Sequence, residues 1–133
     1  MIGKSLIRIL GGIAVAGVTA IAAQAAELVM VEQTGCEWCK RWNEEIGEIY
    51  PKTHEGKFAP LRRVDLRNMP DDITVTRRVN FTPTFLIVED GHEKARLEGY
   101  PGEDFFWPVL DKLLADSVGY DPEDTAPLAG SNS

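Results

Sequence analysis

The stretch Thr34-Gly35-Cys36-Glu37-Trp38-Cys39-Lys40-Arg41-Trp42 decides how this 133-residue chain folds. It holds the only two cysteines of the sequence, Cys36 and Cys39. An apolar run precedes it, and apolar residues recur at intervals of three and four after it. The pair is therefore predicted at the start of a helix that follows a strand. Unpaired backbone N–H groups and the helix dipole stabilise a thiolate at such a position, which indicates thiol–disulfide exchange.

The first 25 residues have the pattern of a signal peptide. Lys4 and Arg8 supply positive charge, residues 9–22 form an apolar run, and Ala23-Gln24-Ala25 is a small-x-small cleavage site. The alternative is a retained membrane anchor, but the apolar run is shorter than the roughly 20 residues that a spanning helix needs. We therefore expect cleavage before Ala26 and export of the remaining chain.

The chain that remains is one small acidic domain. Removing residues 1–25 takes away two basic residues and no acidic one, so the formal net charge changes from −7 to −9. Such a surface repels nucleic acid and anionic lipid, and we expect neither as a partner. The domain is predicted to span residues 26–116. Residues 117–133 have few large apolar side chains and are predicted to form a flexible tail.

The apolar pattern predicts an α/β fold with the element order β-α-β-α-β-β-α. One βαβ unit followed by a hairpin and a helix forms a four-stranded mixed sheet, with helices expected on both faces. Ile49 and Phe105 are expected on the buried sides of their helices, and Pro108 is expected to make the first turn of the last helix irregular. Strands are expected over residues 28–32, 61–66, 84–89 and 93–100, and helices over residues 38–50, 73–80 and 104–115.

The cysteine pair resembles the redox motif of thioredoxin-like proteins, in which a Cys-x-x-Cys opens a helix directly after a strand. Cys36 is expected to lie exposed and to attack a partner's disulfide as the thiolate. Cys39 is expected to resolve the mixed disulfide from the buried side. A zinc half-site and an inert structural disulfide are the alternatives. Zinc needs four ligands, and the two histidines, His54 and His92, lie in separate segments at no recognised spacing, so we expect no metal and no bound cofactor.

Further residues are expected to contact a partner, namely Glu37, Trp38, Thr82 and Pro83. Trp38 is expected to belong to an apolar docking surface, whereas Trp42 is expected in the core. The carboxylate of Glu37 disfavours a second negative charge beside Cys36, which favours a role as a reductant. Thioredoxin-like folds hold a cis-proline loop against the cysteines, and we expect Thr82-Pro83 there. The alternative is an ordinary proline where a strand begins.

Three segments extend the resemblance beyond the cysteine stretch: Pro60-Leu61-Arg62-Arg63-Val64-Asp65, Phe81-Thr82-Pro83-Thr84-Phe85 and Gly99-Tyr100-Pro101-Gly102. Across them the mature domain resembles the SoxS proteins, which are exported thioredoxin-like proteins encoded with bacterial sulfur-oxidation systems. The resemblance implies a periplasmic reductant that keeps a cysteine of a partner protein active, such as that of the sulfur-carrier complex SoxYZ. It also implies a membrane thiol electron donor. We expect the protein itself to be a monomer.

One position departs from the thioredoxin pattern. Thioredoxin carries a buried acid on the strand six residues before its first cysteine, and Met30 occupies that position here. Glu32 is expected to face the other way or to lie at the end of the strand. Proton transfer to and from Cys39 is therefore expected to depend on water or on Glu32.

Two other functions remain open at this point. One is a different thiol–disulfide exchanger, either a reductase for haem attachment or a general one. The other is a non-catalytic module that docks a partner through Trp38 and the Thr82 loop. Reduction of insulin disulfides, with loss of activity in Cys36→Ser, distinguishes an exchanger from a docking module.

Overall fold

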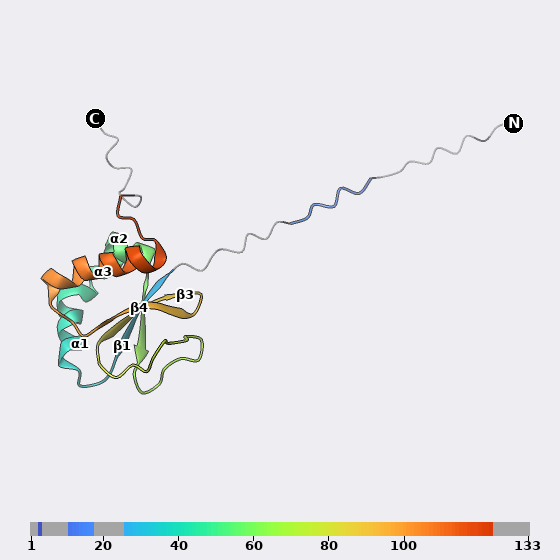
Figure 1. Cartoon of the computed structure of the whole chain (residues 1–133). Helices are drawn as coiled ribbons and strands as arrows, with labels where there is room; N and C mark the ends of the chain where they lie inside the picture. The colour runs from blue at the N-terminus through green and yellow to red at the C-terminus, as the bar shows by residue number, and fades with distance from the viewer. Residues whose placement is uncertain (1–2, 4–10, 18–25, 124–133) are drawn as a thin grey trace, which may run out of the picture.

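A mixed sheet of four strands forms the centre of the protein (Figure 1). The computed structural model describes residue 3, residues 11–17 and residues 26–123, so most of the predicted signal peptide and the end of the predicted tail lie outside the described residues. The strands lie in the order β2-β1-β3-β4, with β1 parallel to β2 and β3 antiparallel to both of its neighbours. The predicted four-stranded mixed sheet is confirmed. Its strands are β1 (Glu27–Glu32), β2 (Leu61–Asp65), β3 (Thr84–Glu89) and β4 (His92–Glu98).

The central strands β1 and β3 are buried on both faces of the sheet, which explains their nearly continuous apolar sequences. Successive side chains of a strand point to opposite faces, so these two strands supply two separate cores. Leu28 and Phe85 belong to the larger core, which also contains residues of the helices. Val29 and Leu86 belong to the smaller core on the opposite face.

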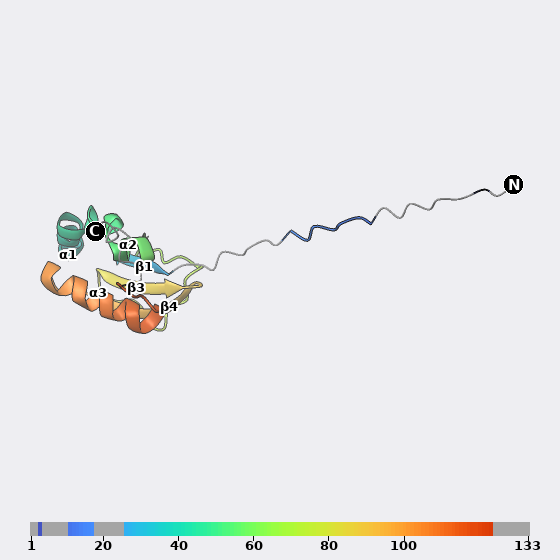
Figure 2. The ribbon, with the colours of Figure 1, turned by 90° about the horizontal axis from the view of Figure 1, so that it is seen from above.

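The helices pack on the face of the sheet that carries the larger core. Seen from above, α1 and α2 lie on the β1 side of the molecule, and α3 lies along β3 and β4 (Figure 2). The ring of Trp42, the last residue of α1, packs against both β3 and α3. Its centroid lies 5.3 Å from that of Phe85 and 5.9 Å from that of Phe106. The helical elements are α1 (Glu37–Trp42), the π-helical turn η1 (Asn43–Gly47), the 3-10 turn η2 (Tyr50–Lys52), α2 (His54–Phe58) and α3 (Glu103–Val118).

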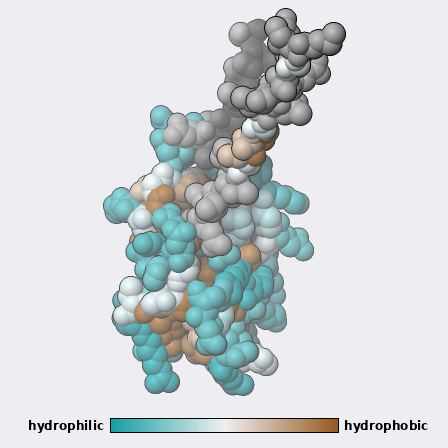
Figure 3. Space-filling model, turned by 90° about the vertical axis from the view of Figure 1, so that its right-hand side faces the viewer, coloured by the Kyte–Doolittle hydropathy of each residue, from teal (hydrophilic) through white to brown (hydrophobic). Residues whose placement is uncertain are grey.

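The opposite face of the sheet is covered by the loop of residues 66–83, and the helix predicted over residues 73–80 does not form. Ile73 and Val79 are buried in the smaller core, as the prediction required. However, residues 73–76 are β-branched throughout, which disfavours a helix, and Thr74 forms an isolated parallel bridge with His92. The expectation of helices on both faces is therefore wrong. Apolar residues show between polar ones on this side of the molecule (Figure 3).

A buried ion pair fastens this loop to β4. The carboxylate of Glu93 accepts hydrogen bonds from the Arg96 guanidinium, from the Thr76 hydroxyl and, at 2.6 Å, from the Thr76 backbone N–H. Arg96 in turn donates to the carbonyl of Arg77 at 2.8 Å. Burial opposes the ionisation of Glu93, but the hydrogen bonds outweigh it and lower the pKa of this carboxyl. The loop that leads to Thr82 is thus held by charge as well as by apolar packing.

The helix predicted over residues 38–50 is interrupted after Trp42. The π-helical turn that follows takes more residues per turn, so the side chains after it are rotated relative to those of α1. As a result Tyr50 is buried, whereas Ile49, which was expected to face inward, is 50% exposed. The Tyr50 hydroxyl donates to the carbonyl of Ala59 at 2.6 Å, and burial raises the pKa of Tyr50. This bond ties η2 to the residue that follows α2.

The last helix is regular from Glu103 onward although it contains Pro108. The bond that proline removes would have reached the carbonyl of Asp104, and both residues lie on the exposed side, where water can serve that carbonyl. The expected irregular first turn is therefore wrong. So is the expected burial of Phe105, which is 66% exposed. The predicted domain end at residue 116 falls inside α3, and Tyr120 beyond it is still buried in the larger core.

Candidate redox-active site

The two cysteines lie at the start of α1, just after the turn that follows β1, and they form a disulfide with their Cα atoms 5.2 Å apart. Gly35 precedes them with a φ of +82°, a left-handed conformation that suits glycine. Cys36 is the N-cap residue of α1, and its sulfur accepts a hydrogen bond from the Cys39 N–H at 3.1 Å. A thiolate at this position would accept the same bond, which stabilises the negative charge.

The two cysteines differ in exposure in the way that the predicted roles require. Cys36 is half-buried and reachable from solvent, whereas Cys39 is only 4% exposed and belongs to the larger core. A partner can therefore reach Cys36 but not Cys39. The roles of nucleophile and resolving thiol remain predictions that this geometry supports.

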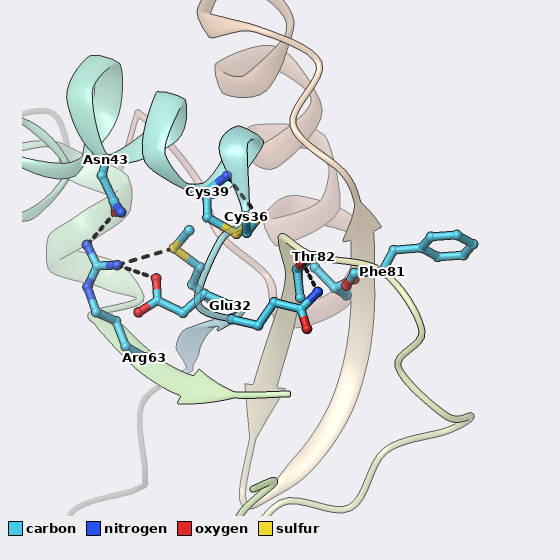
Figure 4. The surroundings of a disulfide bond; sticks show 10 residues. Glu32, Cys36, Cys39, Asn43, Arg63, Phe81 and Thr82 are labelled. Atoms are coloured by element: carbon cyan, nitrogen blue, oxygen red, sulfur yellow. Dashed lines mark hydrogen bonds and ion pairs between the residues drawn. A yellow bond between two sulfur atoms is a disulfide. The ribbon is translucent and has the colours of Figure 1, made fainter. Parts of the chain in front are cut away.

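The loop before β3 lies beside the disulfide (Figure 4). The Thr82–Pro83 peptide bond is cis. The side-chain amide of Gln33 donates to the Thr82 hydroxyl at 2.9 Å, and the carbonyl of Gln33 accepts from the Cys36 N–H. Gln33 thereby joins the loop to the segment that carries Cys36, a link that the sequence did not suggest.

Exposed aromatic side chains occur on both segments of the site. Trp38 is 52% exposed, and the Arg41 guanidinium lies over its ring at 5.5 Å. Phe81, next to Thr82, is 60% exposed and points toward solvent in Figure 4. Glu37 is exposed as well, while Trp42 is fully buried, as predicted. Contact of Glu37, Trp38, Thr82 and Pro83 with a partner remains a prediction.

A cavity of about 460 Å³ opens beside the disulfide on the β2 side, lined by both cysteines and by charged residues that include Glu32 and Arg63. Arg63 donates to the Glu32 carboxylate at 2.7 Å and to the Asn43 side-chain oxygen at 2.8 Å. Glu32 is the last residue of β1, as one alternative expected, but it does not face away from the site. Residues two apart on a strand share a face, so Glu32 and Met30 point to the same side.

Only part of this cluster was predicted from the sequence, because Glu32 was expected near the cysteines and Arg63 and Asn43 were not. Parallel pairing places Arg63 of β2 opposite Met30 of β1, a register that no local pattern specifies. Asn43 enters the cluster because it opens η1, and that interruption of the helix was not predicted.

Within the described part of the chain, no helix is long and apolar enough to cross a membrane, and no group of three or more His, Cys, Asp or Glu side chains is placed to hold a metal ion.

The sheet, the helix-capping disulfide and the adjoining cis-proline loop define a thioredoxin-like thiol–disulfide oxidoreductase. Residues 14–114 match the model of the thioredoxin-like domain family, and the chain belongs to that family. The chain is also similar to a solved structure, the crystal structure of the periplasmic thioredoxin SoxS from Paracoccus pantotrophus in its reduced form. The two are 48% identical over 68% of this chain and 96% of that chain, with a TM-score of 0.66. The resemblance to SoxS proteins that the sequence indicated is confirmed.

Proposed function

We propose that this protein is a periplasmic thiol–disulfide oxidoreductase that reduces a partner protein. The observation that carries the proposal is the disulfide between Cys36, half-buried at the N-cap of α1, and Cys39, which is buried. An inert structural disulfide has no need of this difference in exposure. The 48% identity to a protein described as a periplasmic thioredoxin supports the location, as does the signal-like sequence of residues 1–25.

The reaction moves two electrons from the dithiol to the partner. In the reduced protein, the Cys36 thiolate attacks a sulfur of the partner's disulfide, and a mixed disulfide forms as the partner's other sulfur leaves as a thiolate. Cys39 loses its proton and attacks the Cys36 sulfur. This closes the Cys36–Cys39 disulfide and releases the partner's second sulfur as a thiolate, which takes up a proton. A thiol donor must then reduce the disulfide again.

We propose as partner a protein with an oxidised or otherwise blocked cysteine, of the kind that the sulfur-carrier complex SoxYZ presents, and as donor a membrane thiol protein. The similarity to SoxS supports this choice. The net charge of −9 that remains once residues 1–25 are removed favours a partner with a basic patch around its cysteine, because opposite charges steer the two proteins together. The exposed rings of Trp38, between the two cysteines, and of Phe81, next to Thr82, supply apolar contact area near the disulfide.

The test is reduction of insulin disulfides and of a purified SoxYZ-type partner by the pre-reduced protein. We expect activity in the unaltered protein and none in Cys36→Ser. Cys39→Ser is the matched variant, because it keeps the attacking thiol and loses only the resolving one, and it should accumulate a mixed disulfide visible on a non-reducing gel. A cysteine pair that stays unreactive toward both substrates would instead favour a docking module.

A further inference from the structure

We propose that Glu32 accepts the proton that Cys39 releases when the mixed disulfide resolves, and that Arg63 is the positioning residue that holds Glu32 for this task. The inference rests on the proposed function, since it concerns the second step of the same exchange reaction. It assigns a role to a charged pair that lines the cavity beside the disulfide.

The resolving step needs such an acceptor because Cys39 is poorly placed to ionise by itself. A thiol attacks a disulfide only as the thiolate, and an ordinary cysteine with a pKa of about 8.5 is only about 3% ionised at neutral pH. Burial in apolar surroundings disfavours the charged form further. Cys39 is 4% exposed and packs in the larger core, so its proton must leave through the cavity.

The cavity offers that route. Its volume of about 460 Å³ has room for several water molecules, and its lining includes Cys39 and Glu32. Two other carboxylates line it but are less suited. Glu37 lies on the exposed surface of α1, and one oxygen of Asp65 accepts the backbone N–H of Arg67 at 2.8 Å in the turn after β2. Glu32 is the carboxylate of the cavity that is anchored by an ion pair.

Arg63 is fixed by contacts with several elements at once. One terminal nitrogen donates to Glu32 at 2.7 Å and lies 3.6 Å from the Met30 sulfur, and the other donates to Asn43 at 2.8 Å (Figure 4). The guanidinium also lies over the Trp42 ring at 5.8 Å. A side chain held by β1, η1 and a core aromatic ring has little freedom, so its partner carboxylate is held beside the cavity as well.

The charges balance during the step. The Cys39 S–H bond breaks, its proton passes to the Glu32 carboxylate, and the sulfur becomes a thiolate that attacks the Cys36 sulfur. While Glu32 is neutral, the Arg63 guanidinium keeps its bonds to Asn43 and Met30. Its positive charge then offsets the negative charge of the new thiolate. The proton then returns through the cavity to solvent or to the departing thiolate of the partner.

The experiment follows both steps with Ellman's reagent. The reduced protein releases a first coloured thiolate when Cys36 forms the mixed disulfide and a second when Cys39 resolves it. We expect Glu32→Gln and Arg63→Met to slow the second release roughly tenfold near pH 6.5. The difference should narrow as the pH rises past about 9, because the thiol then ionises increasingly without help. Arg63→Lys should fall between, because it keeps the charge but not the paired contacts.

The matched control is Arg62→Met, since Arg62 is the neighbouring residue of β2 but pairs with Asp72 at 2.8 Å and does not line the cavity. It should leave both releases unchanged at every pH. A second release that slows equally at all pH values in Glu32→Gln, or does not slow, would overturn the inference, and Glu32→Gln serves for this if Arg63→Met fails to fold. Absence of the first release in the unaltered protein would instead count against the proposed function itself.

Discussion

The buried pair of Glu93 and Arg96 provides a quantitative test of what holds the loop of residues 66–83 against the sheet. The perturbation is Glu93→Gln, which removes the negative charge with little change of shape. The side chain of Glu93 is 2% exposed and that of Arg96 is 6% exposed, so the arginine would keep a buried positive charge without its nearest carboxylate. We therefore expect a large loss of stability and a loosened loop.

The size of the loss follows from the contacts that remain. Removing one partner of a buried ion pair costs about 3–5 kcal/mol. Arg96 keeps its hydrogen bonds to the carbonyls of Arg77 and Arg78 and its ion pair with the Glu98 carboxylate at 3.4 Å. Glutamine at position 93 can still accept a bond from Thr76. We therefore expect a decrease of about 2–3 kcal/mol in the free energy of unfolding, which for a domain of this size lowers Tm by about 10–20 °C.

The measurement is urea unfolding followed by circular dichroism, for Glu93→Gln, Arg96→Met and the double variant. The double variant should lose less than the sum of the two single ones, because each single variant already breaks the same pair. Since the pKa of Glu93 is lowered in the folded protein, its stabilisation is present above the ordinary carboxyl pKa and is lost as the pH falls through the lowered value. The difference between Glu93→Gln and the unaltered protein should therefore shrink in acid.

The control is Asp116→Asn, which breaks the exposed pair with Lys112 and should change the urea midpoint little. A Glu93→Gln protein that unfolds at the same urea concentration as the unaltered one would refute the reasoning. So would losses in Glu93→Gln and Arg96→Met that simply add in the double variant.

Three further predictions concern packing and pH. Gly56→Ala should lower the free energy of unfolding by at least about 2 kcal/mol in urea unfolding, because a Cβ there would lie 1.8 Å from a backbone carbonyl oxygen of η2; an unchanged midpoint would contradict this close approach. Phe106→Ala should cost about 3–5 kcal/mol, since the ring is fully buried, whereas its exposed neighbour Phe105→Ala should cost little, and equal losses would contradict the observed face of α3. Burial and the neighbouring Glu55 carboxylate raise the pKa of Asp111 to about 7, so the folded state holds a proton that the unfolded state releases, and stability should fall as the pH rises from about 4 to about 7. Melting curves of Asp111→Asn over this range should lack that part of the slope, and a slope that persists unchanged would exclude Asp111 as its source.

The features that could be predicted from the sequence are those that a short stretch determines. The strand over residues 84–89 was predicted with its observed bounds, because a run of apolar and β-branched residues between turn signals suits a strand buried on both faces. The position of Cys36 at the start of a helix and the burial of Trp42 follow equally from local pattern. Each of these depends on side chains only a few residues apart.

The features that were missed depend on contacts between distant segments. The spacing of Ile73 and Val79 is compatible with a helix and equally with a loop that buries both side chains in the smaller core. The bridge between Thr74 and His92 favours the loop. The place of Arg63 in the site depends on the register of β2 against β1, which pairs residues 33 positions apart. No local pattern carries that information.

The loop on the smaller core has a consequence for how the molecule opens. Segments with few backbone hydrogen bonds and no helix open locally at a lower free energy than the strands and helices of a core. Amide protons of residues 66–80 should therefore exchange with solvent through small local openings. Amide protons of β1 and β3 should exchange only when the whole domain unfolds. Thr82 comes just after this loop segment, whereas Cys39 belongs to the larger core, so the residue that adjoins the disulfide is attached to an adaptable segment while the buried cysteine lies in a rigid one.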